Sequence, residues 1–261
     1  MKKINHKLHV NKIKKQGYTV IKNFLSTTEL SLIKKKVKKI EKQKNTVKTG
    51  NNIWHLHNYD RIFTKIICKK EVQKILMPLL NDPFYKTINL KLPNYILGES
   101  MIIDEKGFMN LHLDSYIPSS SSKLYMANVL FLLDDRTRDN ACTILVKKTH
   151  RKDSYPDRNK KNYNYLYLEG KKGDLIIYDS RIWHGRCEAK INTPNRTLVY
   201  IVQSWFIKQR FDYIHLLPNR IYTKLNNLEK QFLGFCSIPP KDNKKVISLR
   251  QGYEVLKNKK N

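Results

Sequence analysis

Three residues in two distant segments have the types and the spacing of a metal site. His112 and Asp114 are separated by one residue, and His184 follows far downstream. Two histidines and one carboxylate are the protein ligands of mononuclear Fe(II) sites that keep further coordination positions open. Because residues i and i+2 of a strand point to the same face, His112 and Asp114 could reach one ion. The sequence therefore predicts a metal-binding and catalytic triad of His112, Asp114 and His184.

One arginine has the properties of an anion-binding residue near this triad. Arg196 lies twelve residues after His184 and opens the apolar run Thr197 to Val202. By strand alternation its side chain shares a face with Leu198 and Tyr200, so the guanidinium would need an anionic partner in an apolar interior. A guanidinium can hold a carboxylate at two points. We expect Arg196 to bind a carboxylate-bearing co-substrate.

Two other groups of possible metal ligands carry weaker signals. His55 and His57 have the same i, i+2 spacing, but their segment reads as loop or edge strand and offers no convincing third ligand. The four cysteines are scattered without a Cys-x-x-Cys pair. This predicts reduced structural thiols and neither a zinc knuckle nor a disulfide framework.

The composition bounds the protein class. A chain of 261 residues with 40% hydrophobic content can bury one sizeable core. The formal net charge is +29, but lysine runs are spread along the whole chain. Nucleic-acid readout typically shows clustered arginines interleaved with aromatic residues. We interpret the charge as a solvated surface and expect no nucleic-acid partner, while weak contact with anionic partners stays open.

The sequence carries no membrane or secretion signal. No stretch of about eighteen apolar residues occurs, and the lysine-rich start lacks an apolar segment with a small-residue cleavage site. We expect a cytoplasmic protein with no membrane association. The sequence leaves the oligomeric state open, with a monomer as the default expectation.

The first third of the chain predicts helices around one short strand. Gly17 to Leu25 reads as a turn followed by a half-buried strand, and Ser26 is a helix N-cap before apolar residues at helical spacing up to Ile40. Residues 41–52 read as a polar loop. Residues 71–80 read as a second helix that stops before Pro83.

From residue 84 onward, short β-branched and aromatic runs alternate with turn residues, which is typical of a sandwich or jelly roll. The predicted strands are 95–103, 124–133, 142–146, 163–168, 174–179 and 197–206, and a final helix is predicted over 218–232. We predict one mainly β domain over residues 1–261 with flanking helices. It comprises a helical N-terminal part (about 1–83), a jelly-roll core (about 84–206) and a helical tail (207–261).

The chain resembles the phytanoyl-CoA dioxygenase (PhyH) family of Fe(II)/2-oxoglutarate-dependent oxygenases from about residue 16 to about residue 206. The resemblance is carried by the segment Gly17 to Ser26, by the stretch from Leu133 through Asn140 to His150, and by the triad with Arg196. His150 matches a family position that we expect to be structural. One departure is Arg186, two residues after His184, where the family often has a small hydroxyl residue.

The resemblance implies a double-stranded β-helix, a cupin-like jelly roll, with Fe(2+) held by His112, Asp114 and His184. It also implies 2-oxoglutarate as co-substrate, held by Arg196, and hydroxylation of a small molecule with O₂, giving succinate and CO₂. The presence of Asp114 favours hydroxylation over halogenation. Two alternatives stay open: a catalytically silent jelly-roll binding module, and an oxygenase acting on nucleic acid. The sequence leaves the substrate, the aromatic residues that line the pocket and any co-substrate contacts beyond Arg196 open.

Overall fold

The strands form two antiparallel sheets that face each other. The computed structural model describes residues 4–84, 93–160 and 162–235. In these residues the larger sheet has seven strands in the order β1-β9-β6-β11-β4-β3-β2, and the smaller has four in the order β5-β10-β7-β8. The strands are β1 (Tyr18–Ile21), β2 (Lys48–Thr49), β3 (Asn52–Trp54), β4 (Tyr95–Ile103), β5 (Met109–His112), β6 (Met126–Leu132), β7 (Thr143–Val146), β8 (Tyr165–Leu168), β9 (Leu175–Asp179), β10 (His184–Arg186) and β11 (Thr197–Ser204). This is the predicted jelly-roll class.

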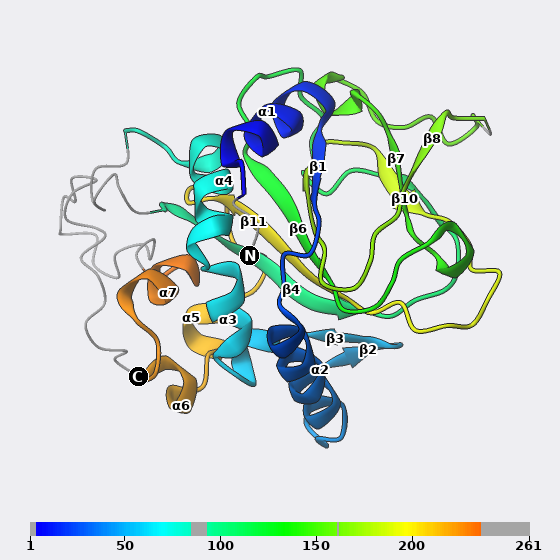
Figure 1. Ribbon diagram of the computed structural model, residues 1–261. Helices are drawn as coiled ribbons and strands as arrows, with labels where there is room; N and C mark the ends of the chain where they lie inside the picture. The colour runs from blue at the N-terminus through cyan, green and yellow to red at the C-terminus, as the bar shows by residue number, and fades with distance from the viewer. Residues whose placement is uncertain (1–3, 85–92, 161, 236–261) are drawn as a thin grey trace.

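Helices cover the outer face of the larger sheet (Figure 1). They are α1 (His6–Gln16), α2 (Thr27–Glu41), α3 (Ile62–Ile67), α4 (Lys70–Leu80), α5 (Tyr213–Leu216), α6 (Asn219–Tyr222) and α7 (Asn227–Phe232), with short 3-10 turns at Leu56–Asn58, Arg138–Asn140 and Thr149–Arg151. Ile33 and Val37 of α2 join one core with Val129 and Leu198 of the sheet. Alternate residues of the same strands point the other way, between the two sheets.

Two of the predicted helices are confirmed. Helix α2 begins after Ser26, whose side chain accepts from the Glu29 amide while Glu29 accepts from the Ser26 amide. This reciprocal capping box satisfies two amides that the first turn would leave unpaired. Helix α4 also matches its prediction. Helices α1 and α3 were not predicted, since α1 buries only Val10 and Ile13 and so lacks a long apolar stripe.

The C-terminal helix prediction is wrong as a single element. The apolar residues of 218–232 belong to two short helices, α6 and α7, and Asn226 is the N-cap of α7, where it forms a capping box with Glu229. Because a residue at an N-cap has extended backbone, the helix cannot run through Asn226. The predicted tail beyond residue 235, and residues 85–92 at the start of the predicted jelly-roll core, lie outside the described residues.

Cys68, Cys142 and Cys187 are free thiols, and Cys236 lies outside the described residues. Among the helices of the described residues, none combines the length and the apolar character needed to cross a membrane.

Candidate active site

The structure brings His112, Asp114 and His184 together between the two sheets. His112 ends β5 and His184 begins β10, and the two residues face each other across this antiparallel pair. Asp114 lies just beyond the end of β5, where its amide donates to the Ser180 carbonyl (2.8 Å). One ligand atom from each side chain lies within 4.8 Å of the others. The spacing on which the prediction rested is therefore correct, although Asp114 follows the strand and is not part of it.

Both imidazoles point the same nitrogen toward the carboxylate. His184 Nε2 lies 3.2 Å from Asp114 Oδ2, and His112 Nε2 lies 3.5 Å from Oδ1. The Nδ1 atoms lie 3.0 Å from the carbonyls of Ile182 and Asn110. A ring whose Nδ1–H is held by a carbonyl keeps Nε2 available as a metal ligand.

The charges of the three side chains are coupled. Burial disfavours the ionised carboxyl, but the nearby His184 and His112 imidazoles outweigh this effect and hold the pKa of Asp114 well below its ordinary value. Burial likewise opposes protonation of His112, and the Asp114 carboxylate raises its pKa above the ordinary value. An ionised carboxylate that attracts positive charge suits a cation at this position.

A second layer of polar residues fixes the carboxylate. Asn128 Nδ2 donates to Asp114 Oδ2 (2.6 Å) and to the Tyr178 hydroxyl (3.1 Å). Ser180 Oγ donates to Asn128 Oδ1 (2.5 Å), which orients the carboxamide. Partners of this kind hold a ligand in place and tune its affinity for metal.

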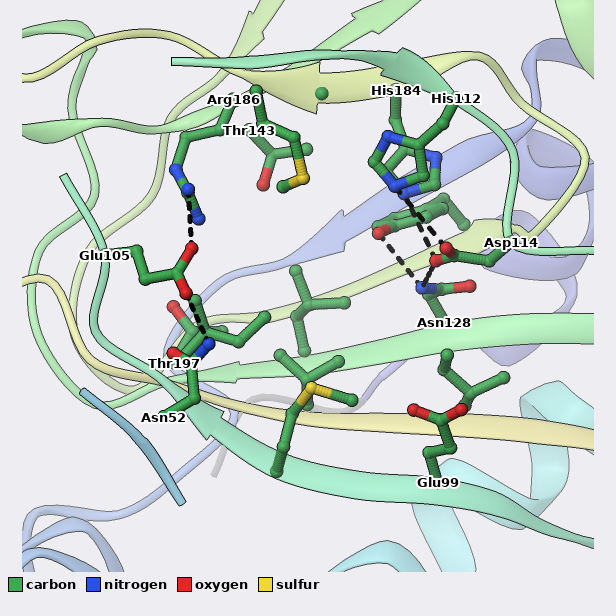
Figure 2. Close-up of a pocket in the computed structure, with 18 of the residues that line it drawn as sticks. Asn52, Glu99, Glu105, His112, Asp114, Asn128, Thr143, His184, Arg186 and Thr197 are labelled. Atoms are coloured by element: carbon green, nitrogen blue, oxygen red, sulfur yellow. Dashed lines mark hydrogen bonds and ion pairs between the residues drawn. The ribbon is translucent and has the colours of Figure 1, made fainter. Parts of the chain in front are cut away.

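A cavity of about 380 Å³ opens beside the triad and is lined from both sheets. Figure 2 shows the triad at one end and Arg186 with Glu105 at the other, with apolar side chains between them. Arg186 Nη2 lies 2.6 Å from Glu105 Oε2, and the Asn52 carboxamide donates to Oε1 of the same glutamate (2.5 Å). The cavity thus has the three possible metal ligands at one end and, at the other, an arginine paired with the carboxylate of Glu105.

A second guanidinium, that of Arg136, lines the cavity and is 5% exposed. Its Nη1 and Nη2 donate to the carbonyls of Asn195 (2.7 Å) and Ala141 (2.6 Å), and among the described residues it forms no ion pair. Burial, followed by repulsion from Arg186, lowers its pKa to about 10. A buried cation without a counter-ion is costly, so this end of the cavity favours an anion.

Arg196 does not line this cavity. Its Nε lies 3.2 Å from Asp104 Oδ2, and its Nη2 lies 3.2 Å from Glu41 Oε1 at the end of α2. The alternation along β11 is as predicted, but the face shared by Arg196, Leu198 and Tyr200 is the face covered by helices. Thr197, Val199 and Ile201 face the cavity instead. The structure therefore brings Arg196 neither to the triad nor to the cavity, and its ion pairs with Glu41 and Asp104 do not support its predicted role as a clamp.

His55 and His57 are packed within the fold and are not part of a group of three possible metal ligands among the described residues. His57 Nδ1 lies 2.9 Å from Ser100 Oγ, and complete burial lowers the pKa of His57 to about 3. His150, expected to be structural, is also buried, with Nε2 at 3.3 Å from the Lys14 carbonyl. Within the described residues, only the triad forms a group of three possible metal ligands.

Sequence reasoning missed Arg136, Asn128 and Glu99 as cavity residues. Arg186 could have been recognised as a cavity residue, because it places a charge two residues after His184, where the family often has a small hydroxyl residue. No periodicity marks Arg136, which lies outside the strands and reaches the cavity from a loop.

Comparison with known proteins identifies the family. The model of the family described as Phytanoyl-CoA dioxygenase (PhyH) matches residues 13–187. The chain is 21% identical over 250 residues to uncharacterized protein Mb1539 of Mycobacterium bovis, covering 85% of this chain and 84% of the relative.

Two solved structures share the fold. EctD from S. alaskensis, with 2-oxoglutarate and 5-hydroxyectoine, has a TM-score of 0.61 at 15% identity, covering 75% of this chain and 74% of that chain. HygX from Streptomyces hygroscopicus, with nickel and 2-oxoglutarate, has a TM-score of 0.64 at 10% identity, covering 77% and 88%. The family model spans more than half of the chain, so the chain belongs to the phytanoyl-CoA dioxygenase (PhyH) family of 2-oxoglutarate-dependent oxygenases, as its motifs predicted.

Proposed function

We propose that this protein is an Fe(II)- and 2-oxoglutarate-dependent dioxygenase that hydroxylates a small molecule. The observation that carries the proposal is the convergence of His112, Asp114 and His184 beside a cavity whose far end presents two arginines. Two structural neighbours support a small-molecule substrate, since HygX has been solved with hygromycin B bound and EctD with 5-hydroxyectoine.

The three side chains fit a ferrous ion. They supply two neutral nitrogen donors and one carboxylate oxygen, a set that suits non-haem Fe(II). His112, Asp114 and His184 would hold the metal, and Asn128 would keep Asp114 in position. The remaining coordination positions would face the cavity, since all three side chains line it.

We assign the carboxylate end of the co-substrate site to Arg136 and Arg186 in place of Arg196. Arg136 is buried without an acidic partner, and Arg186 is already held against one carboxylate, that of Glu105. The Thr143 side chain lines the same end and can add a hydroxyl donor. Two guanidiniums and a hydroxyl match the distal carboxylate of a dicarboxylic acid.

When bound, iron with 2-oxoglutarate and O₂ supplies the oxidising power that converts a substrate C–H bond into an alcohol, with succinate and CO₂ as products. The chain's own part is positioning and exclusion of water. Met101, Leu130 and Val199 form the apolar wall between the two polar ends and keep the reacting centre dry.

The test of the proposed function combines metal binding with turnover. We expect anaerobic calorimetry to show one Fe(II) site, and iron-dependent succinate release in the presence of substrate. His184→Ala should abolish both, whereas His215→Ala, at a side chain that is 71% exposed, should retain both. A folded protein that binds no iron would refute the proposal, and iron binding without succinate release from any substrate would favour the silent binding module.

The arginine assignment has its own test. Removing one charge-assisted contact to the distal carboxylate should raise the dissociation constant of 2-oxoglutarate roughly 10- to 100-fold. We expect this for Arg136→Lys and Arg186→Met, with no change for Arg196→Met, measured on the Fe(II) form by anaerobic titration. The opposite pattern, with only Arg196→Met affected, would return the role to Arg196.

A further inference from the structure

A buried carboxylate faces the iron end of the cavity from the opposite wall. Glu99 lies on β4 of the larger sheet, whereas His112 and His184 come from the smaller sheet (Figure 2). Its side chain is 4% exposed, yet it lines the cavity. Burial raises the pKa of Glu99, the hydrogen bond and charge of Arg210 offset part of this effect, and the Asp114 carboxylate adds to it. Such a group costs stability, so its position needs a reason other than folding.

A break in strand alternation directs this side chain into the cavity. Tyr95 and Leu97 of β4 belong to the helix-covered core, but Glu99 and Met101 line the cavity. Ile201 of β11 pairs with Glu99, and the next residue, Val202, pairs with Leu97, so Gly98 is the extra residue of a bulge. The side chains of β4 therefore change from one face of the sheet to the other at Gly98. A Cβ on Gly98 would meet Gln203 Oε1 at 2.5 Å and the Ile201 carbonyl oxygen at 3.2 Å, so glycine lets the bulge form without a shift of the Gln203 side chain. Without the bulge, Glu99 would face the apolar core.

Among the described residues, the Glu99 carboxylate is hydrogen-bonded to a single side chain, that of Arg210 at the cavity rim. Arg210 Nη1 donates to Glu99 Oε1 (2.8 Å) and has a side chain that is 59% exposed. Within the described part of the chain, Glu99 Oε2 accepts no hydrogen bond. Because the Arg210 guanidinium is largely exposed, its ion pair with Glu99 is worth little more than its hydration by water, so another cation can replace it.

The charges of the cavity are divided between its ends. Two arginines, Arg136 and Arg186, oppose the single carboxylate of Glu105 at the far end. Two carboxylates, Asp114 and Glu99, lie at the iron end with Arg210 at the rim. One of these carboxylates is a metal ligand, which leaves Glu99 as the acid that a bound substrate would meet.

We propose that the substrate carries a protonated amine, which displaces Arg210 and pairs with Glu99 so that a neighbouring C–H bond faces the iron. The proposal rests on the proposed function, because it names the substrate class of the same cavity. Arg210 stands in for the ammonium group when no substrate is bound. The site disfavours acyl substrates whose only charged groups are anionic, since these would place a second negative charge beside a buried carboxylate.

The experiment compares matched amines with their neutral derivatives. The holoprotein with Fe(II) and 2-oxoglutarate, kept anaerobic, is titrated with putrescine, spermidine, lysine and glucosamine and with the N-acetylated form of each. We expect at least one amine to bind at least 10-fold more tightly than its acetylated form. Glu99→Gln should remove this preference, because the neutral carboxamide cannot form an ion pair. Glu188→Gln, at an exposed position, should keep it.

A second variant distinguishes the cation from an anion. If an amine displaces Arg210, Arg210→Gln should bind the amine as tightly as the wild type or more tightly. If instead Arg210 recruits an anionic substrate, the same variant should weaken binding of an acidic probe such as N-acetylglutamate, and Glu99→Gln should not weaken it. That result would overturn the proposal.

The binding of iron and 2-oxoglutarate separates this inference from the proposed function. Glu99→Gln should bind both as the wild type does, which also shows that the variant folds. If the wild type binds neither, the proposed function fails. If it binds both but no amine binds in preference to its acetylated form, or Glu99→Gln retains the preference, only the inference about the substrate is wrong.

Discussion

At the scale of single residues, the proposed metal site depends on Asn128, a side chain outside the triad. Asn128 contacts Asp114, Tyr178 and Ser180, so it fixes the orientation in which Oδ2 of the carboxylate faces His184 and Oδ1 faces His112. Without it, Asp114 could rotate, and part of its preorganisation for the metal would be lost.

Replacing this bridge should weaken metal binding without removing it. We expect Asn128→Ala to raise the dissociation constant for Fe(II) about 10- to 100-fold, the range for partners that orient metal ligands. Anaerobic calorimetry would measure it, with the exposed Asn159→Ala as the matched control. Wild-type affinity in Asn128→Ala would mean that Asp114 is held by its backbone alone.

His57 provides a pH dependence of stability that is separate from the metal site. Its pKa is lowered to about 3 in the folded protein, first by burial and then by the neighbouring His55, against an ordinary value of 6.5. Between these two values the unfolded chain binds a proton that the folded chain excludes. His57 therefore does not reduce the free energy of unfolding above about pH 6.5, and it reduces that free energy progressively as pH falls from 6.5 toward 3.

Removing the imidazole should flatten this dependence. Each pH unit below 6.5 should cost the wild type up to about 1.4 kcal/mol more than a variant without a titratable group at this position. His57→Gln retains a polar side chain beside Ser100 and is suitable for this comparison. Urea unfolding at pH 7, 6 and 5 would measure the difference, and parallel curves for the two proteins would contradict a buried neutral His57.

At the scale of elements, the close approach of β5 and β10 places the two histidines. Gly185 follows His184 on β10, and a Cβ there would clash with the Met109 carbonyl oxygen and lie 3.1 Å from that of Asn110. Since both contacts are backbone atoms of β5, the strand would have to move. Its last residue, His112, would move with it.

We expect Gly185→Ala to lower the free energy of unfolding by about 1–3 kcal/mol, the usual range for overpacking, and to weaken Fe(II) binding. Gly107→Ala is the matched control in the segment that leads into β5, because an added Cβ there meets no atom within 4 Å. Thermal unfolding and iron titration of the two variants would test this. Equal behaviour of the two would show that β5 and β10 can separate freely.

The arrangement of the strands explains which features could be predicted from the sequence. Alternation along Thr197 to Val202 gave the correct strand, but a strand has two buried faces in this fold, and apolar residues occupy both. The pattern of a single strand does not say which face meets the ligands, so it could group Arg196 with Leu198 and Tyr200 but not show that helices cover that face. The His112 and Asp114 pair could be recognised because ligand types are rare and the two residues are one apart at a strand end, whereas His184 reaches them through the pairing of β5 with β10. Arg136 was not predictable, because only the tertiary fold brings its loop to the cavity.

The bulge at Gly98 could not be predicted from the sequence of one strand. Residues 95–103 were predicted as a strand with the bounds of β4, yet regular alternation would place Glu99 with Leu97 in the helix-covered core. The register with β11 decides the face, and register is a property of two strands.

At the scale of the whole molecule, one core joins the helices to the sheet. Residues of α1, α2, α3 and α4, the larger sheet and the C-terminal helices belong to a single cluster of buried side chains. An N-terminal part that shares its core with the jelly roll has no apolar interior of its own. We therefore predict that residues 1–261 unfold as one domain.

Truncating one side chain of α2 tests this. Ile33 is fully buried in the shared core, so Ile33→Ala should cost about 2–5 kcal/mol and lower the melting temperature by roughly 2–4 °C per kcal/mol. Leu32→Ala, at the adjacent and 44% exposed position, should change it little. Because helices and sheet share the core, circular dichroism and tryptophan fluorescence should report one coincident transition that moves as a whole in Ile33→Ala. Two transitions, with only the helical one shifted, would instead show that the N-terminal helices fold as a unit separate from the jelly roll.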